Sequence, residues 1–282
     1  MTTRLLVVAL AAHLVLAKTV LIVTADASDW VLAAGGTIAS MVERGDRAIL
    51  LRTINDDKDS WNLGPEETAV RAKSEVEQAA RILGVTQVIS LGYRGGELGG
   101  VSPTELRDRI LIYIRIHKPD VLFIPNPYAE YVEVLDRHYT GMAAEEARRA
   151  AALRNHQPTH GAAGLEPHYT GELYYYAQPF DPRRREPEAS ATFVPQPVVR
   201  DIASTYSKKL RAAQALKTIN YAMAMRIRER LDATGRRLPL LDTVNDASVN
   251  RLVEINVSNS PSRQAEEFHY AGTDYQVPKK LR

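Results

Sequence analysis

The sequence predicts an α/β protein in which a parallel sheet is sandwiched between helices, a Rossmann-like arrangement. Segments typical of strands and helices alternate from residue 18 onward, a pattern typical of parallel sheets with right-handed crossovers. The strand-like runs are apolar on both faces, as expected of strands that helices cover on both sides. The 282 residues, 45% hydrophobic and 25% charged, suffice for one large domain. We therefore predict a single domain with an elaborated C-terminal third.

Local patterns place the individual elements. A β-rich run precedes a small-residue helix that Gly45 closes, and Pro65 and Pro103 open two further helices. The predicted strands are residues 20–24, 48–53, 86–91, 121–124 and 172–178. The predicted helices are residues 31–43, 65–83, 103–117 and 201–233. Ligands of such sheets bind beyond the carboxyl ends of the strands. The loops to inspect are therefore residues 25–30, 54–64, 92–102 and 126–138.

The N-terminus is typical of a secretory signal peptide. Arg4 precedes an apolar stretch over residues 5–17, which ends in the small-residue cleavage signal Val-Leu-Ala. This stretch is shorter than the roughly 20 apolar residues of a membrane span. We therefore expect residues 1–17 to be removed and residues 18–282 to form the mature domain. The protein is then exported, either periplasmic or secreted, with no stable membrane span.

Charge and cysteine content exclude several classes of partner and site. The net charge is +2 and no basic block is dense, so nucleic acid is not an expected partner. The chain contains no cysteine, which excludes disulfides and thiolate metal sites. Any metal must therefore be bound through carboxylate, imidazole, carbonyl or water.

The run LIVTADASDWVLAAGGTIA at residues 21–39 is similar to the first motif of the LmbE/PIG-L zinc-dependent de-N-acetylases. That motif is a strand, then Ala-His-Pro-Asp-Asp-Glu, then a small-residue helix. The resemblance extends in consistent order over nearly the whole chain after residue 18. The further matching segments are Arg71, Glu75, Ala79-Ala80, 83–85, 91–94, PDVLFIPNPY at 119–128, Asp136 to Gly141, LYYY at 173–176 and 265–268. It implies a Rossmann-like fold and a hydrolase of N-acyl sugars.

Mapped residue by residue, the resemblance implies an altered first motif. Asp26 stands at the zinc-binding His and Ser28 at the general base. Asp29 stands at the second zinc ligand, which is retained, and Trp30 replaces the final Glu. The first motif thus keeps one of its metal ligands and lacks its base.

The second motif is altered as well. The family has His-Pro-Asp-His, where this chain has Val-Leu-Asp-Arg. Val134 stands at the oxyanion-stabilising His, Asp136 at the retained Asp and Arg137 at the last zinc ligand. His138 follows one residue later, and Gly95 replaces a further acidic residue of the family.

Two interpretations of the first loop stay open. In one, Asp26, Asp29 and His138 form an Asp/Asp/His site for one divalent metal, either zinc or a harder ion such as manganese. In the other there is no metal, because the two aspartates cap the following helix. Arg137 then pairs with a carboxylate where the cation would lie.

Catalysis depends on whether a base has been relocated. Ser28 cannot accept a proton from water without a base of its own. A missing general base costs about 10²–10⁴ in rate, and a missing oxyanion donor about 10²–10³. Substitutes for the base would come from the fourth loop, where the candidates are Glu130, Glu133 and Asp136.

Residues suited to ligand binding are better retained. Arg71 resembles a substrate-contact position of the family. Trp30 either presents an aromatic ring at the mouth of a pocket or packs at the edge of the core. The candidate substrate-binding residues are Arg71, Trp30, Tyr93, Arg94 and Arg137, with Tyr128 and Tyr131 in the facing loop.

Two functional hypotheses follow. In the favoured one, the chain is an exported LmbE/PIG-L-like protein that binds a small molecule or glycan. Its zinc and base machinery has been replaced and ordinary deacetylase activity is weak or lost. In the alternative, it is an active metal-dependent amide hydrolase with an Asp/Asp/His site and a relocated base.

Overall fold

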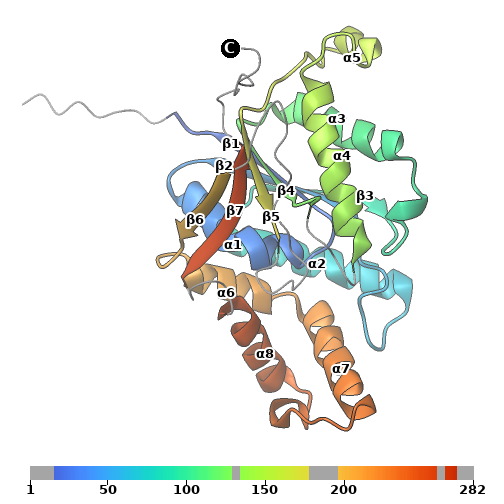
Figure 1. Ribbon diagram of the computed structural model, residues 1–282, viewed down its shortest axis with the longest axis vertical. Helices are drawn as coiled ribbons and strands as arrows, with labels where there is room; N and C mark the ends of the chain where they lie inside the picture. Colours follow the sequence, from blue (N-terminus) through green and yellow to red (C-terminus); the bar gives the residue numbers. More distant parts are fainter. Residues whose placement is uncertain (1–15, 129–133, 178–195, 259–263, 272–282) are drawn as a thin grey trace, which may run out of the picture.

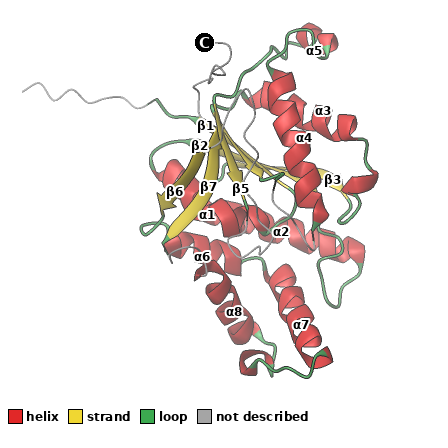
Figure 2. Cartoon of the chain, in the orientation of Figure 1, coloured by secondary structure: helices red, strands yellow, loops and turns green. Residues whose placement is uncertain are grey.

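A computed structural model of the chain describes residues 16–128, 134–177, 196–258 and 264–271. A seven-stranded sheet lies between two layers of helices, with strand order β3-β2-β1-β4-β5-β7-β6 (Figures 1 and 2). The strands are β1 (Thr19–Thr24), β2 (Arg47–Ile54), β3 (Gln87–Tyr93), β4 (Val121–Pro125), β5 (Glu172–Tyr176), β6 (Gln196–Asp201) and β7 (Ala265–Ala271). The α-helices are α1 (Asp29–Glu43), α2 (Pro65–Leu83), α3 (Pro103–His117), α4 (Leu135–Ala151), α5 (Pro158–Ala162), α6 (Tyr206–Gln214), α7 (Lys217–Ala233) and α8 (Asp246–Ser258).

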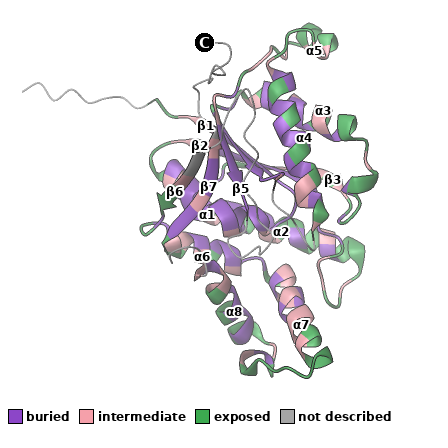
Figure 3. Ribbon diagram, viewed as in Figure 1, coloured by how far each residue is buried: buried purple, intermediate pink, exposed green. Residues whose placement is uncertain are grey.

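The two faces of the sheet bury two separate cores. Along β1, Val20 and Ile22 face the core beneath α1, α2 and α6, whereas Leu21 and Val23 face the core beneath α3 and α4. The central strands are buried over nearly their whole length (Figure 3). The strands are apolar on both faces because helices cover both sides of the sheet, as the sequence predicted.

The predicted fold class is confirmed, and the elements up to residue 125 lie within two residues of their predicted bounds. The sheet is not parallel throughout, because β7 runs antiparallel to both β5 and β6. The prediction of one long helix over 201–233 is wrong. The chain leaves the helical conformation at Leu216, where ψ is 58°. The two resulting helices, α6 and α7, both contact α2 and α8, and α6 also packs on α1.

Most of the predicted signal peptide lies outside the described residues. Leu16 is 86% exposed, and the first strand begins three residues later at Thr19. In the described ranges, every helix is too short or too polar to cross a membrane.

Helix α1 is fixed to the C-terminal part of the chain through a buried ion pair. The carboxylate of Glu266 in β7 accepts hydrogen bonds from the backbone N–H groups of Gly36, at 2.9 Å, and Thr37, at 2.8 Å. The same carboxylate pairs with Lys209 of α6 at 2.8 Å, and both side chains are 0% exposed. A Cβ atom at Gly36 would lie 2.7 Å from the side chain of Ile202. Only glycine therefore permits this close approach.

Candidate functional site

The loop between β1 and α1 lies at the switch point of the sheet, where ligands of such folds bind. β1 is flanked by β2 on one side and β4 on the other. Asp26 is buried in this loop, and its Oδ1 atom accepts hydrogen bonds from three groups. These are the backbone N–H of Ser28 at 2.9 Å, its hydroxyl at 2.9 Å and the backbone N–H of Asp29 at 3.0 Å. Asp26 thus caps the amino end of α1, as one interpretation of the sequence expected.

Arg137 occupies the space between the two aspartates of this loop. Its Nε atom lies 2.7 Å from Oδ2 of Asp26 and 3.6 Å from Oδ1 of Asp29. All three side chains are nearly removed from solvent, with 12% of Arg137, 6% of Asp26 and 0% of Asp29 exposed. A cation supplied by the chain itself therefore balances the carboxylates.

The ionisation of Asp26 reflects this pairing. Burial raises the pKa of a carboxyl group. The nearby charge of Arg137 and its hydrogen bond oppose burial, and together with the N–H groups of Ser28 and Asp29 they bring the pKa of Asp26 below its ordinary value. Asp26 is therefore an ionised carboxylate at neutral pH.

The donor set does not fit the metal ion that the resemblance implies. A guanidinium lies at hydrogen-bonding distance from the carboxylate that would have to hold the ion. His138, the third proposed ligand, places Nδ1 2.9 Å from the carbonyl oxygen of Pro127. Adjacent helical residues point about 100° apart, so α4 cannot direct both Arg137 and His138 at Asp26. Across the described ranges, no group of three or more histidine or acidic side chains is arranged to hold a metal.

Asp136 and Ser28 have structural contacts in place of catalytic ones. The two carboxylate oxygens of Asp136 accept hydrogen bonds from the backbone N–H groups of Gly96, at 2.5 Å, and Leu98, at 3.1 Å. Burial raises the pKa of Asp136, and these two hydrogen bonds oppose the rise. The hydroxyl of Ser28 donates to Asp26. Asp136 therefore shapes the loop after β3, and Ser28 shapes the loop after β1.

Two aspartates that the motif comparison did not single out, Asp56 and Asp57, lie in the loop after β2. Together with Asp26, Asp29, Asp136 and Arg137 they form what we call the polar edge of the sheet. Asp57 accepts hydrogen bonds from Nε of Arg94 and from the backbone N–H of Gly95, both at 2.9 Å. A Cβ atom on Gly95 would lie 3.5 Å from this carboxylate. Asp57 thus supplies a carboxylate beside Gly95, where the family has an acidic side chain. The signal available in the sequence was the Asn-Asp-Asp run directly after the second strand.

Asp56 is the second of these residues and is fully buried. Its Oδ1 accepts a hydrogen bond from the backbone N–H of Ala27 at 3.2 Å, and Oδ2 lies 3.3 Å from Arg52. Burial raises the pKa of Asp56 to about 8 despite Arg52, and the negative charges of Asp26 and Asp59 add to the rise. Asp56 is therefore the carboxyl group of this edge that holds a proton at neutral pH.

Two of the predicted binding residues have contacts elsewhere. Trp30 is 0% exposed and belongs to the core beneath α1, so the core interpretation holds and the ring does not line a pocket mouth. Arg71 lies on the exposed side of α2 and pairs with Glu67 one turn earlier, at 2.7 Å.

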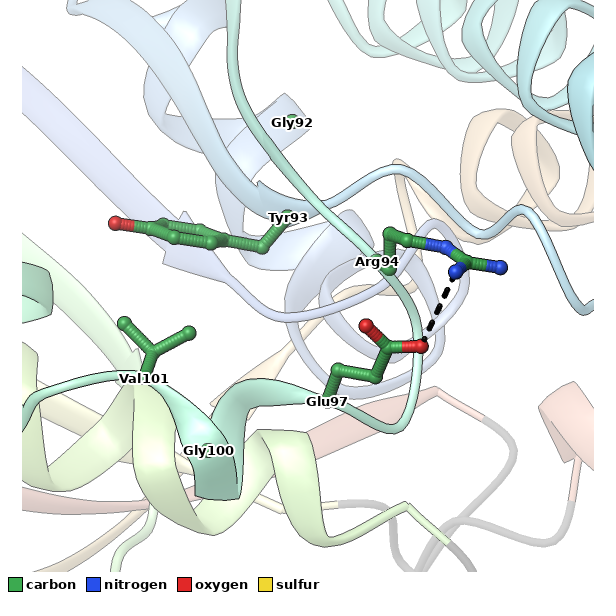
Figure 4. A pocket seen from close by; sticks show the side chains of 6 residues that line it. All are labelled: Gly92, Tyr93, Arg94, Glu97, Gly100 and Val101. Carbon is green, nitrogen blue, oxygen red and sulfur yellow. Dashed lines mark ion pairs between the residues drawn. The ribbon is translucent and has the colours of Figure 1, made fainter.

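Tyr93 and Arg94 line a hollow of about 630 Å³ at the end of β3 (Figure 4). Arg94 lies 3.5 Å from Glu97, which lines the same side of the hollow. The hydroxyl of Tyr93 donates to Glu105 at 2.7 Å, and Arg109 lies over its ring. The hollow is therefore polar on one side and aromatic on the other.

The facing loop after β4 is only partly described. Tyr128 donates to Glu145 at 3.2 Å and packs edge-on against Tyr175. The remaining candidates of this loop, Glu130, Glu133 and Tyr131, lie outside the described residues.

Fold and site together define the class of protein. Residues 21–152 match the PIG-L family, described as GlcNAc-PI de-N-acetylase. The matched range runs from β1 to the end of α4, so it contains the first loop, the polar edge and Arg137. The chain therefore carries a domain of the LmbE/PIG-L family, as its motifs indicated.

Among curated proteins, the chain is similar to the diacetylchitobiose deacetylase of Thermococcus kodakarensis (strain KOD1). The two are 27% identical over 161 residues, which is 56% of this chain and 60% of the relative. The chain thus matches less than two thirds of the length of this relative.

Solved structures show the same fold with different chemistries. The N,N'-diacetylchitobiose deacetylase of Pyrococcus horikoshii, in complex with an inhibitor, has a TM-score of 0.66 at 23% identity, over 91% of this chain and 85% of the other. GalB, a 4-carboxy-2-hydroxymuconate hydratase of Pseudomonas putida KT2440, has a TM-score of 0.60 at 19% identity, over 94% of this chain and all of the other. A fold shared by a deacetylase and a hydratase does not by itself define a reaction.

Proposed function

We propose that this protein binds an N-acylated amino sugar, free or within a glycan, at the polar edge of the sheet, and that ordinary zinc-dependent deacetylation is weak or lost. The observation that carries the proposal is Arg137, whose Nε lies 2.7 Å from Asp26 and 3.6 Å from Asp29. A guanidinium and a divalent cation repel each other, so one pocket does not hold both.

The residues around Arg137 support loss of the ordinary mechanism. The position of the general base holds Ser28, whose hydroxyl donates to a carboxylate. The position of the oxyanion donor holds Val134, which carries no donor in its side chain. Removing a base and an oxyanion donor costs on the order of 10²–10⁴ and 10²–10³ in rate, respectively.

The sugar specificity rests on the family and on the polar edge. Proteins with which this chain shares its fold or family include diacetylchitobiose deacetylases. The hollow beside Tyr93 and Arg94 combines an aromatic ring with charged groups, which suits a polar ring carrying an apolar acetyl group.

The test combines metal analysis, binding and product release. Protein purified without chelator is analysed for zinc and manganese. Binding of N,N'-diacetylchitobiose is then titrated with and without EDTA, and released acetate is measured. We expect no stoichiometric metal, binding that EDTA does not change, and no acetate above the uncatalysed background. Stoichiometric zinc with acetate release would refute the proposal in favour of an active amide hydrolase.

A triple variant tests whether Arg137 replaces the metal. Asp26→His, Ser28→Asp and Arg137→His together restore the two lost metal ligands and the base of the family motifs, and we expect this variant to bind zinc. The matched control is Arg71→His, which makes the same change on an exposed face and should gain no zinc. A triple variant that folds and binds zinc no better than the control contradicts the replacement.

We further propose that the protein is exported after cleavage behind Ala17. In support, Leu16 is 86% exposed and lies three residues before β1. N-terminal sequencing of protein from a fractionated host should give Lys18 as the first residue in the exported fraction. An intact N-terminus in the cytoplasmic fraction would rule this out.

A further inference from the structure

A second cavity involves the pair of helices α7 and α8, which extend from the body of the protein (Figure 1). It measures about 260 Å³ and is lined by residues of α2, α6, α7 and α8. None of its lining residues belongs to the polar edge or to the hollow beside β3. Pockets for drug-sized ligands measure about 300–1,000 Å³, so this cavity suits a smaller molecule.

Charges of both signs converge on this cavity. Arg211 of α6 and Lys217 of α7 contribute two cations, and Asp246 of α8 contributes one carboxylate. In the described part of the chain these three side chains form no ion pair with one another or with any other residue. Their neighbours on the same helices do pair, as Lys208 does with Glu43. All three residues are exposed, and the charge of Lys217 also acts on Glu75 of α2. The cavity thus presents, at its exposed side, cationic and anionic groups that a ligand can reach.

The floor of the cavity offers an oriented acceptor. Asn220 is 7% exposed, and its Nδ2 atom donates to the carbonyl oxygen of Ala213 at 2.7 Å. The carbonyl partner fixes which end of the amide is the donor, so Oδ1 points the other way. Within the described ranges Oδ1 has no hydrogen-bond donor. A buried amide held in this way is expected to meet a donor from a bound molecule or from water.

The rest of the lining is mixed, with polar groups from Gln78, Gln214, Tyr221 and Asn250 beside an aliphatic part. Ile82, Ala215 and Val249 contribute aliphatic surface between the charged groups, and Val249 is 6% exposed. An inorganic anion such as phosphate would use the two cations but would gain nothing from Asp246 or from this aliphatic surface.

We propose that this cavity binds a small zwitterion of the chemical class of an α-amino acid with an aliphatic side chain. Arg211 and Lys217 receive the carboxylate, Asp246 receives the ammonium group, and the aliphatic side chain lies against Ile82 and Val249. Charge-assisted hydrogen bonds at both ends give the orientation, and the apolar contact contributes affinity.

The experiment titrates the full chain with leucine and with two analogues that each lack one charge. N-acetyl-leucine has no ammonium group, and leucine amide has no carboxylate. We expect saturable 1:1 binding of leucine, and binding weaker by about tenfold for each analogue, which corresponds to the loss of one charge-assisted contact. Equal binding of all three molecules, or no saturable binding of leucine at millimolar concentration, overturns the proposal. Binding of inorganic phosphate in competition with leucine, undiminished in Asp246→Asn, likewise overturns it.

Variants assign each charge to its partner. In Asp246→Asn, leucine and N-acetyl-leucine should bind with similar affinity, because the group that distinguishes them is gone. In Arg211→Met, leucine and leucine amide should become similar. Asp232→Asn on α7 and Arg251→Met on α8 are matched controls that do not line the cavity and should retain the full discrimination. Controls that lose it as well contradict the assignment. Binding of diacetylchitobiose should be unchanged in all four variants, so the outcome is independent of the function proposed above.

Discussion

Helix α1 is held at two places by a carboxylate that pairs with a cation from a distant part of the chain. At its amino end, Asp26 caps the helix and pairs with Arg137, and the two side chains are 6% and 12% exposed. In its middle, Glu266 accepts two backbone N–H groups and pairs with Lys209, and both side chains are 0% exposed. The first pair lies at the polar edge of the sheet and the second lies between layers.

The Asp26–Arg137 pair belongs to the candidate site, whereas the Glu266–Lys209 pair belongs to the scaffold, although both use the same chemistry. Both pairs satisfy backbone donors of one helix and neutralise one buried charge with another. They differ in access, because the first pair lies among further aspartates where ligands of this fold bind, whereas α6 and β7 enclose the second. Breaking each pair in turn should therefore give different losses of stability and different dependence on pH.

The largest effect is expected from Lys209→Met. Removing the lysine leaves the carboxylate of Glu266 buried without a cation, which costs about 3 to 5 kcal/mol in the free energy of unfolding. Urea denaturation followed by circular dichroism measures this. The neighbouring Lys208→Met is the control, because Lys208 pairs with Glu43 at an exposed position and should cost less than about 1 kcal/mol. Equal losses of stability in the two variants would show that the buried Glu266–Lys209 pair does not stabilise the fold more than an exposed pair does.

Arg137→Met should lower the free energy of unfolding somewhat less, by about 2 to 3 kcal/mol, because it removes one charged hydrogen bond of Asp26 and leaves the capping bonds in place. The pKa of Asp26 is lowered in the folded protein. The stability that this pairing contributes is therefore complete above the ordinary aspartate pKa and is lost as pH falls through the lowered value. The gap between wild type and variant should shrink on acidification, as urea titrations at several pH values would record. A gap that is constant with pH contradicts the pairing.

Asp56 should make a moderate contribution to the pH dependence of stability, with a sign opposite to that of Asp26. Its pKa is raised to about 8, so between its ordinary value and about 8 the folded state binds more protons than the unfolded state. Stability should therefore fall as pH rises through this window, by at most about 1.4 kcal/mol per pH unit. Asp56→Asn should abolish this slope, whereas the exposed control Asp232→Asn should keep it. A slope that survives in Asp56→Asn would assign it to another group.

The smallest effect is expected from Arg71→Ala. Arg71 and Glu67 are 56% and 54% exposed, and exposed pairs one helical turn apart contribute less than about 0.5 kcal/mol. Binding of diacetylchitobiose should also be unchanged, because this side chain pairs with Glu67 of its own helix. A clear loss of binding in titration calorimetry would return Arg71 to the set of ligand contacts.

Local patterns sufficed to predict most of the fold. Short-range signals such as Pro65 and Gly84 mark the ends of α2, and both are read from neighbouring residues. The break at Leu216 escaped prediction, because the apolar pattern continues through it. Both α6 and α7 contact α2 and α8, and only α6 also packs on α1, a difference in tertiary contacts that no local pattern reports. The antiparallel strands β6 and β7 depend on contacts between segments more than sixty residues apart, which no local pattern reports.

The candidate site was predicted in outline, and its decisive contact was left open. The motifs located Asp26, Asp29 and Arg137, but not which of Arg137 and His138 meets the aspartates. That depends on how α4 is rotated, and Gly141 is involved, because a Cβ there would lie 2.4 Å from the carbonyl oxygen of Pro125. Asp57 was missed for a related reason, since it reaches Gly95 from a neighbouring loop.

The Asp26–Arg137 pair also changes how the first loop depends on its surroundings. A loop closed by a bound ion is stabilised in proportion to the logarithm of the free ion concentration. Here the cation is covalently part of the chain, so its effective concentration is the same in every medium. The loop should thus reach its closed form as soon as α4 docks, in media that contain metal ions and in media from which they have been removed.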